Sequence, residues 1–189
     1  MKNVAIIIIL FQSFQLIYAQ EGFVDTKKYI VTTEISDQGQ DYPAYKVSLV
    51  RADESSEIIS TLTISDTELF EDIFITTLEN PGLEGVSEVI KMEVEYLACC
   101  AHVESYYFMI GENNNIIELP EVKNVYCEDS DTDFQYIFPN QEYGIAGNIL
   151  RTQTFYKNKS DIKYVNLKQS YVWNDNTLGF SKSTAITSY

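Results

Sequence analysis

The chain has 189 residues, of which 28 are acidic, 13 are Lys or Arg and one is His, so its formal net charge is −15. Nucleic-acid binding depends on clustered Lys and Arg that neutralise phosphates, so this composition predicts no nucleic-acid partner. The same repulsion disfavours an anionic membrane surface.

The start of the chain has the three parts of a secretory signal peptide. Lys2 is followed by an apolar run over residues 4–11 and by a polar stretch that ends at Ala19. We expect residues 1–19 to be removed and residues 20–189 to form a single secreted or periplasmic domain. The apolar run is much shorter than the roughly 20 residues that cross a bilayer, and no transmembrane segment is predicted.

Most of the following chain has the pattern of short β-strands. Segments 29–35, 44–50 and 58–64 are rich in β-branched residues and are bounded by polar or turn residues. Segment 89–98 alternates, with apolar side chains on one face and Lys91, Glu93 and Glu95 on the other. This alternation predicts a half-buried strand of an antiparallel sheet.

One segment favours a helix, over residues 66–79. Ser65 and Glu68 form a capping box, and an Asn-Pro-Gly sequence ends the segment before the loop at 79–85. The apolar residues on one helical face are Leu69, Phe70, Ile73, Phe74, Thr77 and Leu78. Residues 73–77 oppose this interpretation, because four of the five are β-branched.

The three cysteines suggest a structural disulfide. Neighbours on a strand point to opposite faces, and α-carbons about 3.8 Å apart are too close for an easy bridge between Cys99 and Cys100. In an exported chain we therefore predict a disulfide between Cys100 and Cys127, with Cys99 as the alternative partner. The remaining cysteine is expected to be buried without a sulfur partner.

Other chemistries of this region remain open alternatives. Three buried free thiols are one, since cysteine is a frequent core residue. Cys99, Cys100, His102 and Cys127 would also supply four ligands for zinc or copper, although their spacing matches no common motif. A cysteine nucleophile with His102 as its base is the least favoured alternative, because no orienting motif surrounds it.

Residues 127–134 resemble part of a calcium loop. Asp129, Asp131 and Asp133 have the spacing of its first three oxygen ligands. Phe134 replaces the turn glycine, and Asn140 replaces the glutamate at the twelfth position. The interpretation is a solvated acidic loop or a noncanonical Ca²⁺ site, so the expectation is no cofactor or Ca²⁺.

The remaining pattern completes the predicted fold. Segments 104–120, 134–138, 148–156 and 162–173 favour further strands, the first as a hairpin about an Asn-rich tip. The prediction is a mainly β, antiparallel, β-sandwich-like single domain with at most one short helix, at about 66–79. An N-glycosylation sequon at Asn158 is relevant only in a eukaryotic secretory route.

The sequence does not reveal a catalytic motif. It contains no Gly-x-Ser-x-Gly, His-Glu-x-x-His or phosphate-loop sequence. The expected function is that of an exported, acidic, non-enzymatic binding or structural module of the cell envelope or extracellular space, with an unknown protein or glycan partner. The alternatives are a secreted hydrolase that uses acidic residues and a calcium- or glycan-binding module.

Glycan binding would use aromatic rings exposed on a β face. The candidates are Tyr106, Tyr107, Phe108, Tyr136, Tyr143, Tyr171 and Trp173.

Overall fold

The computed structural model describes residues 22–35, 41–128, 131–157, 161–175, 177 and 179–182. The predicted signal peptide and the sequon at Asn158 lie outside these residues. The strands are β1 (Val24–Asp25), β2 (Tyr29–Ile35), β3 (Tyr45–Arg51), β4 (Ile58–Ile64), β5 (Phe70–Glu79), β6 (Val86–Leu97), β7 (Ala101–Gly111), β8 (Ile116–Glu118), β9 (Val122–Tyr126), β10 (Thr132–Ile137), β11 (Asn148–Lys157), β12 (Asp161–Asn174) and β13 (Gly179–Lys182). The prediction of a mainly β, antiparallel fold is confirmed.

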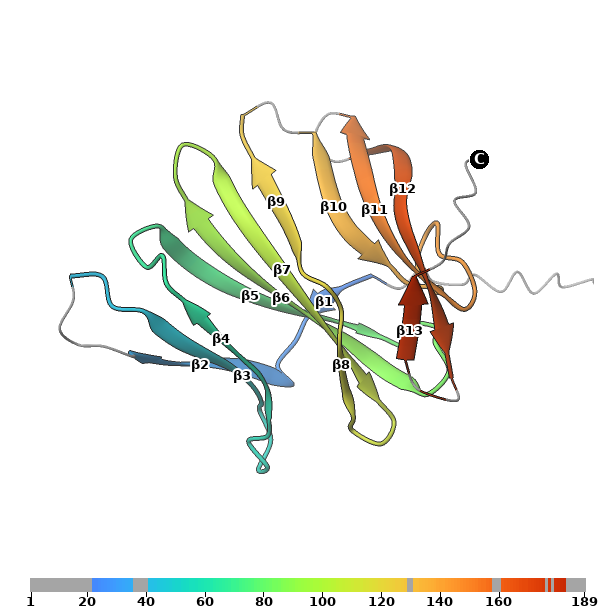
Figure 1. Cartoon of the computed structure of the whole chain (residues 1–189), viewed down its shortest axis with the longest axis horizontal. Coiled ribbons are helices and arrows are strands. Elements are labelled where there is room, and N and C mark those ends of the chain that lie inside the picture. The colour runs from blue at the N-terminus through green and yellow to red at the C-terminus, as the bar shows by residue number, and fades with distance from the viewer. Residues whose placement is uncertain are drawn as a thin grey trace, which may run out of the picture.

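The strands form three sheets. A six-stranded sheet has the order β1-β5-β6-β7-β8, with β9 also paired to β7. A three-stranded sheet contains β2, β3 and β4, and a four-stranded sheet contains β10 to β13 in sequential order. Figure 1 shows the six-stranded sheet between the other two. The predicted sandwich is therefore extended to three layers that share a central sheet.

Alternation along β6 and β7 provides a core on each face of the central sheet. Ile90 pairs with Phe108, and both pack against Leu49 of the three-stranded sheet. The adjacent residue Val89 lies on the other face and belongs to the cluster that contains Tyr136 of the four-stranded sheet. One long hairpin thus supports both outer layers, because adjacent strand residues point in opposite directions.

The predicted helix at 66–79 is wrong, because β5 occupies most of that segment. Ile73 pairs with Val94 of β6, and Thr77 pairs with Ile90. The apolar residues that suggested one helical face are divided between the faces of the sheet: Ile73 packs toward the three-stranded sheet, whereas Leu78 packs toward the four-stranded sheet. Pairing with β6 and the β-branched content of the segment outweigh the capping box.

The polar face predicted for residues 91–95 is less open than expected. The side chains of Lys91 and Glu93 are only 20% and 23% exposed and form an ion pair of 2.7 Å. Lys91 Nζ lies 6.0 Å from the centroids of the Phe23 and Tyr107 rings. The four-stranded sheet lies on this side of the central sheet, so these charges are half-buried between two layers.

Strand β9 was not predicted, and it joins the central sheet to the four-stranded sheet. Asn124 of β9 is buried, and its side-chain amide donates to the carbonyl of Phe134 at 2.9 Å. The Phe134 N–H donates back to Asn124 Oδ1 at 2.7 Å. One side chain thereby replaces a pair of main-chain hydrogen bonds between β9 and β10.

Candidate functional site

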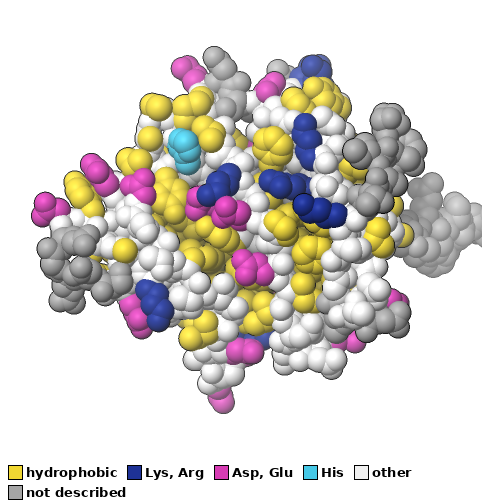
Figure 2. All heavy atoms as spheres, viewed as in Figure 1, with side chains coloured by type: hydrophobic (Ala, Val, Ile, Leu, Met, Phe, Trp, Pro, Cys, Tyr) yellow, Lys and Arg dark blue, Asp and Glu magenta, His cyan; other side chains and the backbone are white. Residues whose placement is uncertain are grey.

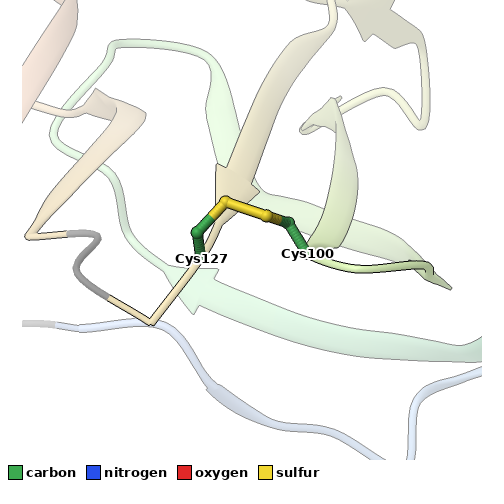
Figure 3. The surroundings of a disulfide bond; sticks show 2 residues. All are labelled: Cys100 and Cys127. Carbon is green, nitrogen blue, oxygen red and sulfur yellow. A yellow bond between two sulfur atoms is a disulfide. The ribbon is translucent and has the colours of Figure 1, made fainter.

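Cys100 and Cys127 form the predicted disulfide, which continues the β7–β9 ladder (Figure 3). Ala101 pairs with Tyr126 at the end of that ladder, so the two cysteines are the next opposing residues. Their α-carbons are 4.6 Å apart, close to the roughly 4.5 Å of a non-hydrogen-bonded antiparallel pair. The bridge therefore fits the strand register without an additional bend.

Cys99 is exposed, so the prediction that the third cysteine is buried is wrong. The strand does not continue through this residue, because residues 98–100 form the turn between β6 and β7. In that turn the Ala98 N–H donates to the Cys100 carbonyl at 3.3 Å. A side chain at a hairpin tip has no facing layer against which to be buried.

The disulfide also removes two ligands from the alternative metal site. Cys100 and Cys127 are bonded to each other, and metal binding requires free thiolates. His102 lies exposed in β7, opposite Tyr96 and Val125. Within the described residues, no group of three His, Cys, Asp or Glu side chains is placed to hold a metal ion.

The possible calcium loop is only partly described. Asp129 lies outside the described residues, and Asp131 is exposed immediately before β10. Asp133 accepts hydrogen bonds from the hydroxyls of Tyr126 and Tyr156. Burial and these contacts raise the pKa of both tyrosines. The carboxylate of Asp133 thus connects three strands, and the calcium site remains a prediction.

A second carboxylate, Glu93, lies near the same tyrosine. Burial raises the pKa of Tyr126, and the negative charges of Asp133 and Glu93 raise it further. Glu93 itself is paired with Lys91 and accepts a hydrogen bond of 3.2 Å from Ser105. Both acids therefore have partners: Glu93 is held within the central sheet, whereas Asp133 links β10 to β9 of the central sheet and to β11.

The structure divides the aromatic candidates for glycan contact into core and surface residues. Tyr107, Phe108, Tyr136, Tyr171 and Trp173 are buried in the two interlayer cores. Tyr106 is partly buried and donates to Glu104 at 2.9 Å. Tyr143, in contrast, is 49% exposed. The sequence pattern did not distinguish these cases, since all of them lie in or near strand-like segments.

Tyr143 lies beside a groove of about 280 Å³. The lining residues are Gly22, Gln135, Tyr136, Ile137, Gln141, Glu142, Tyr143, Ile162 and Val165. Gln135 and Ile137 alternate with Tyr136 along β10, and Tyr136 belongs to the interlayer core. Their side chains therefore point to the outer face of the four-stranded sheet. The sequence analysis missed this site because its residues come from four separate segments.

The loop that carries Tyr143 is held by hydrogen bonds. The Phe138 N–H donates to the side-chain oxygen of Gln141 at 3.0 Å, and the Gln141 N–H donates to the Phe138 carbonyl at 3.0 Å. A Cβ atom at Gly144 would lie 2.3 Å from the Phe138 carbonyl oxygen, so only glycine fits there. Tyr143 itself has a φ of +64°, a conformation that bulky residues rarely adopt.

Charge is distributed unevenly between the sheets. Residues 22–130, which supply the central and three-stranded sheets, contain 22 acidic and six basic residues. Residues 131–182, which supply the four-stranded sheet, contain five acidic and six basic residues. Figure 2 shows Lys and Arg side chains gathered over the four-stranded sheet. The groove therefore lies on the part of the molecule that is close to neutral.

Among the described residues, β13 pairs only with residues 171–174, so the rest of β12 forms an edge of the four-stranded sheet. This edge has features that oppose strand addition. Two register shifts between β11 and β12 leave Lys163 and Lys168 as the additional residues of β-bulges. Bulges and lysines are the devices by which natural proteins prevent edge-to-edge pairing. This edge is thus less suited to binding than the face that carries the groove.

Comparison with known proteins gives no relative for this chain: no family model, no curated protein and no solved structure matches it. In the part of the chain that the structure describes, no helix is long and apolar enough to span a membrane. The function must therefore be argued from the site itself.

Proposed function

We propose that this chain is an exported, non-enzymatic binding module of the cell envelope or extracellular space, and that its binding surface is the groove on the four-stranded sheet. The observation that carries the proposal is the groove, which combines an exposed aromatic ring, amide side chains and aliphatic walls in one concave surface. Binding sites are typically concave, with a few placed polar groups among apolar ones.

The disulfide supports the location outside the cytoplasm. Stable disulfides persist in oxidising compartments, and Cys100–Cys127 is placed by strand register rather than by a mobile loop. The predicted signal peptide agrees with that location. The binding role is favoured over hydrolysis because the two carboxylates that act on Tyr126 already have structural partners: Glu93 is paired with Lys91, and Asp133 accepts hydrogen bonds from Tyr126 and Tyr156.

Cell fractionation with intact-mass analysis tests the location. We expect the chain outside the cytoplasm, shortened after Ala19, with one alkylatable thiol in the denatured, unreduced protein. Full-length protein in the cytoplasm with three free thiols would contradict the proposal.

The non-enzymatic role is tested separately with a panel of chromogenic glycosides, esters and peptides. We expect no turnover by the wild-type chain. Turnover that is lost in both Glu93→Gln and Asp133→Asn would replace the binding role with the hydrolase alternative.

A further inference from the structure

We infer that the groove beside Tyr143 binds a neutral saccharide, with the Tyr143 ring as the stacking platform. This inference rests on the proposed binding role and names its ligand class. It depends on four properties of the site: its volume, its mixture of side chains, its rigidity and the near neutrality of the sheet that carries it.

The volume and the lining suit a single sugar ring. A groove of about 280 Å³ accommodates one monosaccharide unit, and its open side leaves room for a longer chain to continue. A sugar ring has an apolar face of C–H groups and a rim of hydroxyls. The exposed ring of Tyr143 and the aliphatic side chains of Ile162 and Val165 match the apolar face, while Gln135 and Glu142 match the hydroxyls.

The position of Tyr143 is fixed before any ligand arrives. Its hydroxyl donates to the neighbouring carboxylate of Glu142, and its backbone is held in the left-handed region with φ of +64°. A bulky residue in this conformation carries a conformational cost that glycine would avoid, and such strain is concentrated at functional sites. Gln141 and Gly144 hold the loop on both sides of the tyrosine. A pre-ordered aromatic ring loses little entropy on binding.

The charge distribution selects against charged ligands. Residues 131–182 are nearly balanced in charge, and among the described residues that line the groove Glu142 is the one Asp, Glu, Lys, Arg or His. A polyanion would be repelled by Glu142 and by the strongly acidic central sheet. The carboxylate instead suits hydroxyl donors, because hydrogen bonds to a charged acceptor are the stronger ones.

The test is a titration of the purified mature chain, followed by ¹H–¹⁵N NMR, with the methyl glycosides of glucose, galactose and N-acetylglucosamine. We expect saturable shifts at Gln135, Ile162 and Val165 for at least one of these probes, with a dissociation constant on the order of 1 mM for a site of this size. Glucuronate is the charged comparison, and we expect it to bind at least tenfold more weakly.

Tyr143→Gly is the decisive variant, because glycine accepts the left-handed backbone and the loop should remain folded. It should weaken binding at least tenfold, whereas Tyr143→Phe should retain most of the affinity. Tyr42→Ala, which removes a 55% exposed tyrosine remote in sequence from the groove, is the matched control and should have no effect.

Three results would overturn the inference. They are the absence of shifts up to 50 mM of every glycoside, unchanged binding by Tyr143→Gly with an intact spectrum, and shifts confined to the other two sheets. The first two leave the location and the non-enzymatic role standing, because fractionation and the substrate panel test those independently. The third would keep a saccharide ligand but move its site.

Discussion

The two outer sheets pack on the same central sheet but are attached in different ways. The interface with the three-stranded sheet is an apolar cluster that includes Leu49, Met92 and Phe108. Its side-chain hydrogen bonds run from Tyr29 to Glu88 at 2.7 Å and from Lys28, just before β2, to Glu79 and Glu88. The interface with the four-stranded sheet adds a bond from a buried side chain to the main chain, between Asn124 and Phe134. Apolar contact is non-directional, whereas two hydrogen bonds from one side chain to the main chain of a strand fix the position of that strand.

The difference between the two attachments explains the position of the groove. Strand β10 supplies Gln135 and Ile137 to the groove and Phe134 to the contact with Asn124. The same strand is thus anchored by its main chain at the edge that faces β9 and is available for binding on its outer face. A site needs a rigid support, and the directional attachment provides it.

The largest effect is expected in the apolar interface. Phe108→Ala removes a side chain that is 1% exposed and should lower the free energy of unfolding by about 3–5 kcal/mol. Urea denaturation measures this cost. Ile30→Ala, at a position that is 48% exposed, is the control and should cost within about 0.5 kcal/mol. A cost for Phe108→Ala as small as that of the control would contradict the layered core.

Removal of the disulfide should have the next largest effect. Its cysteines are 27 residues apart, and the chain-entropy model gives about 3–4 kcal/mol for a loop of this length. The double variant Cys100→Ser with Cys127→Ser should show this loss in thermal unfolding. Cys99→Ser should be neutral, since that side chain is exposed. Equal losses in the two variants would assign the bridge to the wrong cysteine.

The directional contact is tested by Asn124→Ala. Loss of the amide leaves the Phe134 N–H and carbonyl without their partner, at about 2–3 kcal/mol. Hydrogen exchange should show faster exchange of the Phe134 amide, with the central strands less affected. Tyr29→Phe removes the hydrogen bond to Glu88 at the other interface and should cost about 1 kcal/mol. If both variants loosen β10 equally, the distinction between the two attachments does not hold.

The smallest effect concerns the pH dependence of stability near β9. Burial tends to raise the pKa of Glu104, but hydrogen bonds from Lys123 and Tyr106 outweigh it and leave the pKa below its ordinary value of 4.5. The folded state therefore holds this proton less tightly than the unfolded state. The stability that results is present above pH 4.5 and is lost as the pH falls through the folded pKa.

Glu104→Gln should reduce the acid-induced loss of stability by less than about 1 kcal/mol, because the ion pair with Lys123 is partly exposed. Urea unfolding of both proteins at pH 6 and pH 3 measures the difference. An identical dependence on pH in the two proteins would show that Glu104 is not the group responsible.

The fold class and a disulfide to Cys127 could be predicted from the sequence. Segments 29–35 and 58–64 became strands with the predicted bounds, because β-branched content and alternation are local properties. The geometry of neighbouring cysteines disfavoured a bond between Cys99 and Cys100 and so predicted a bridge to Cys127, with Cys100 as the preferred partner and Cys99 as the alternative; the structure has Cys100. These predictions needed no knowledge of which strand lies beside which.

Features that depend on partners distant in sequence could not be predicted and became visible in the three-dimensional structure. Residues 70–79 are a strand because β6 pairs with them, although local spacing suggested a helix. Cys99 is exposed because the chain turns there. The groove exists because β10, β12, the loop around Tyr143 and Gly22 meet on one face. Spacing in the sequence does not reveal which distant segments are in contact, because these contacts are fixed by long-range strand pairing and by the packing of one layer on another.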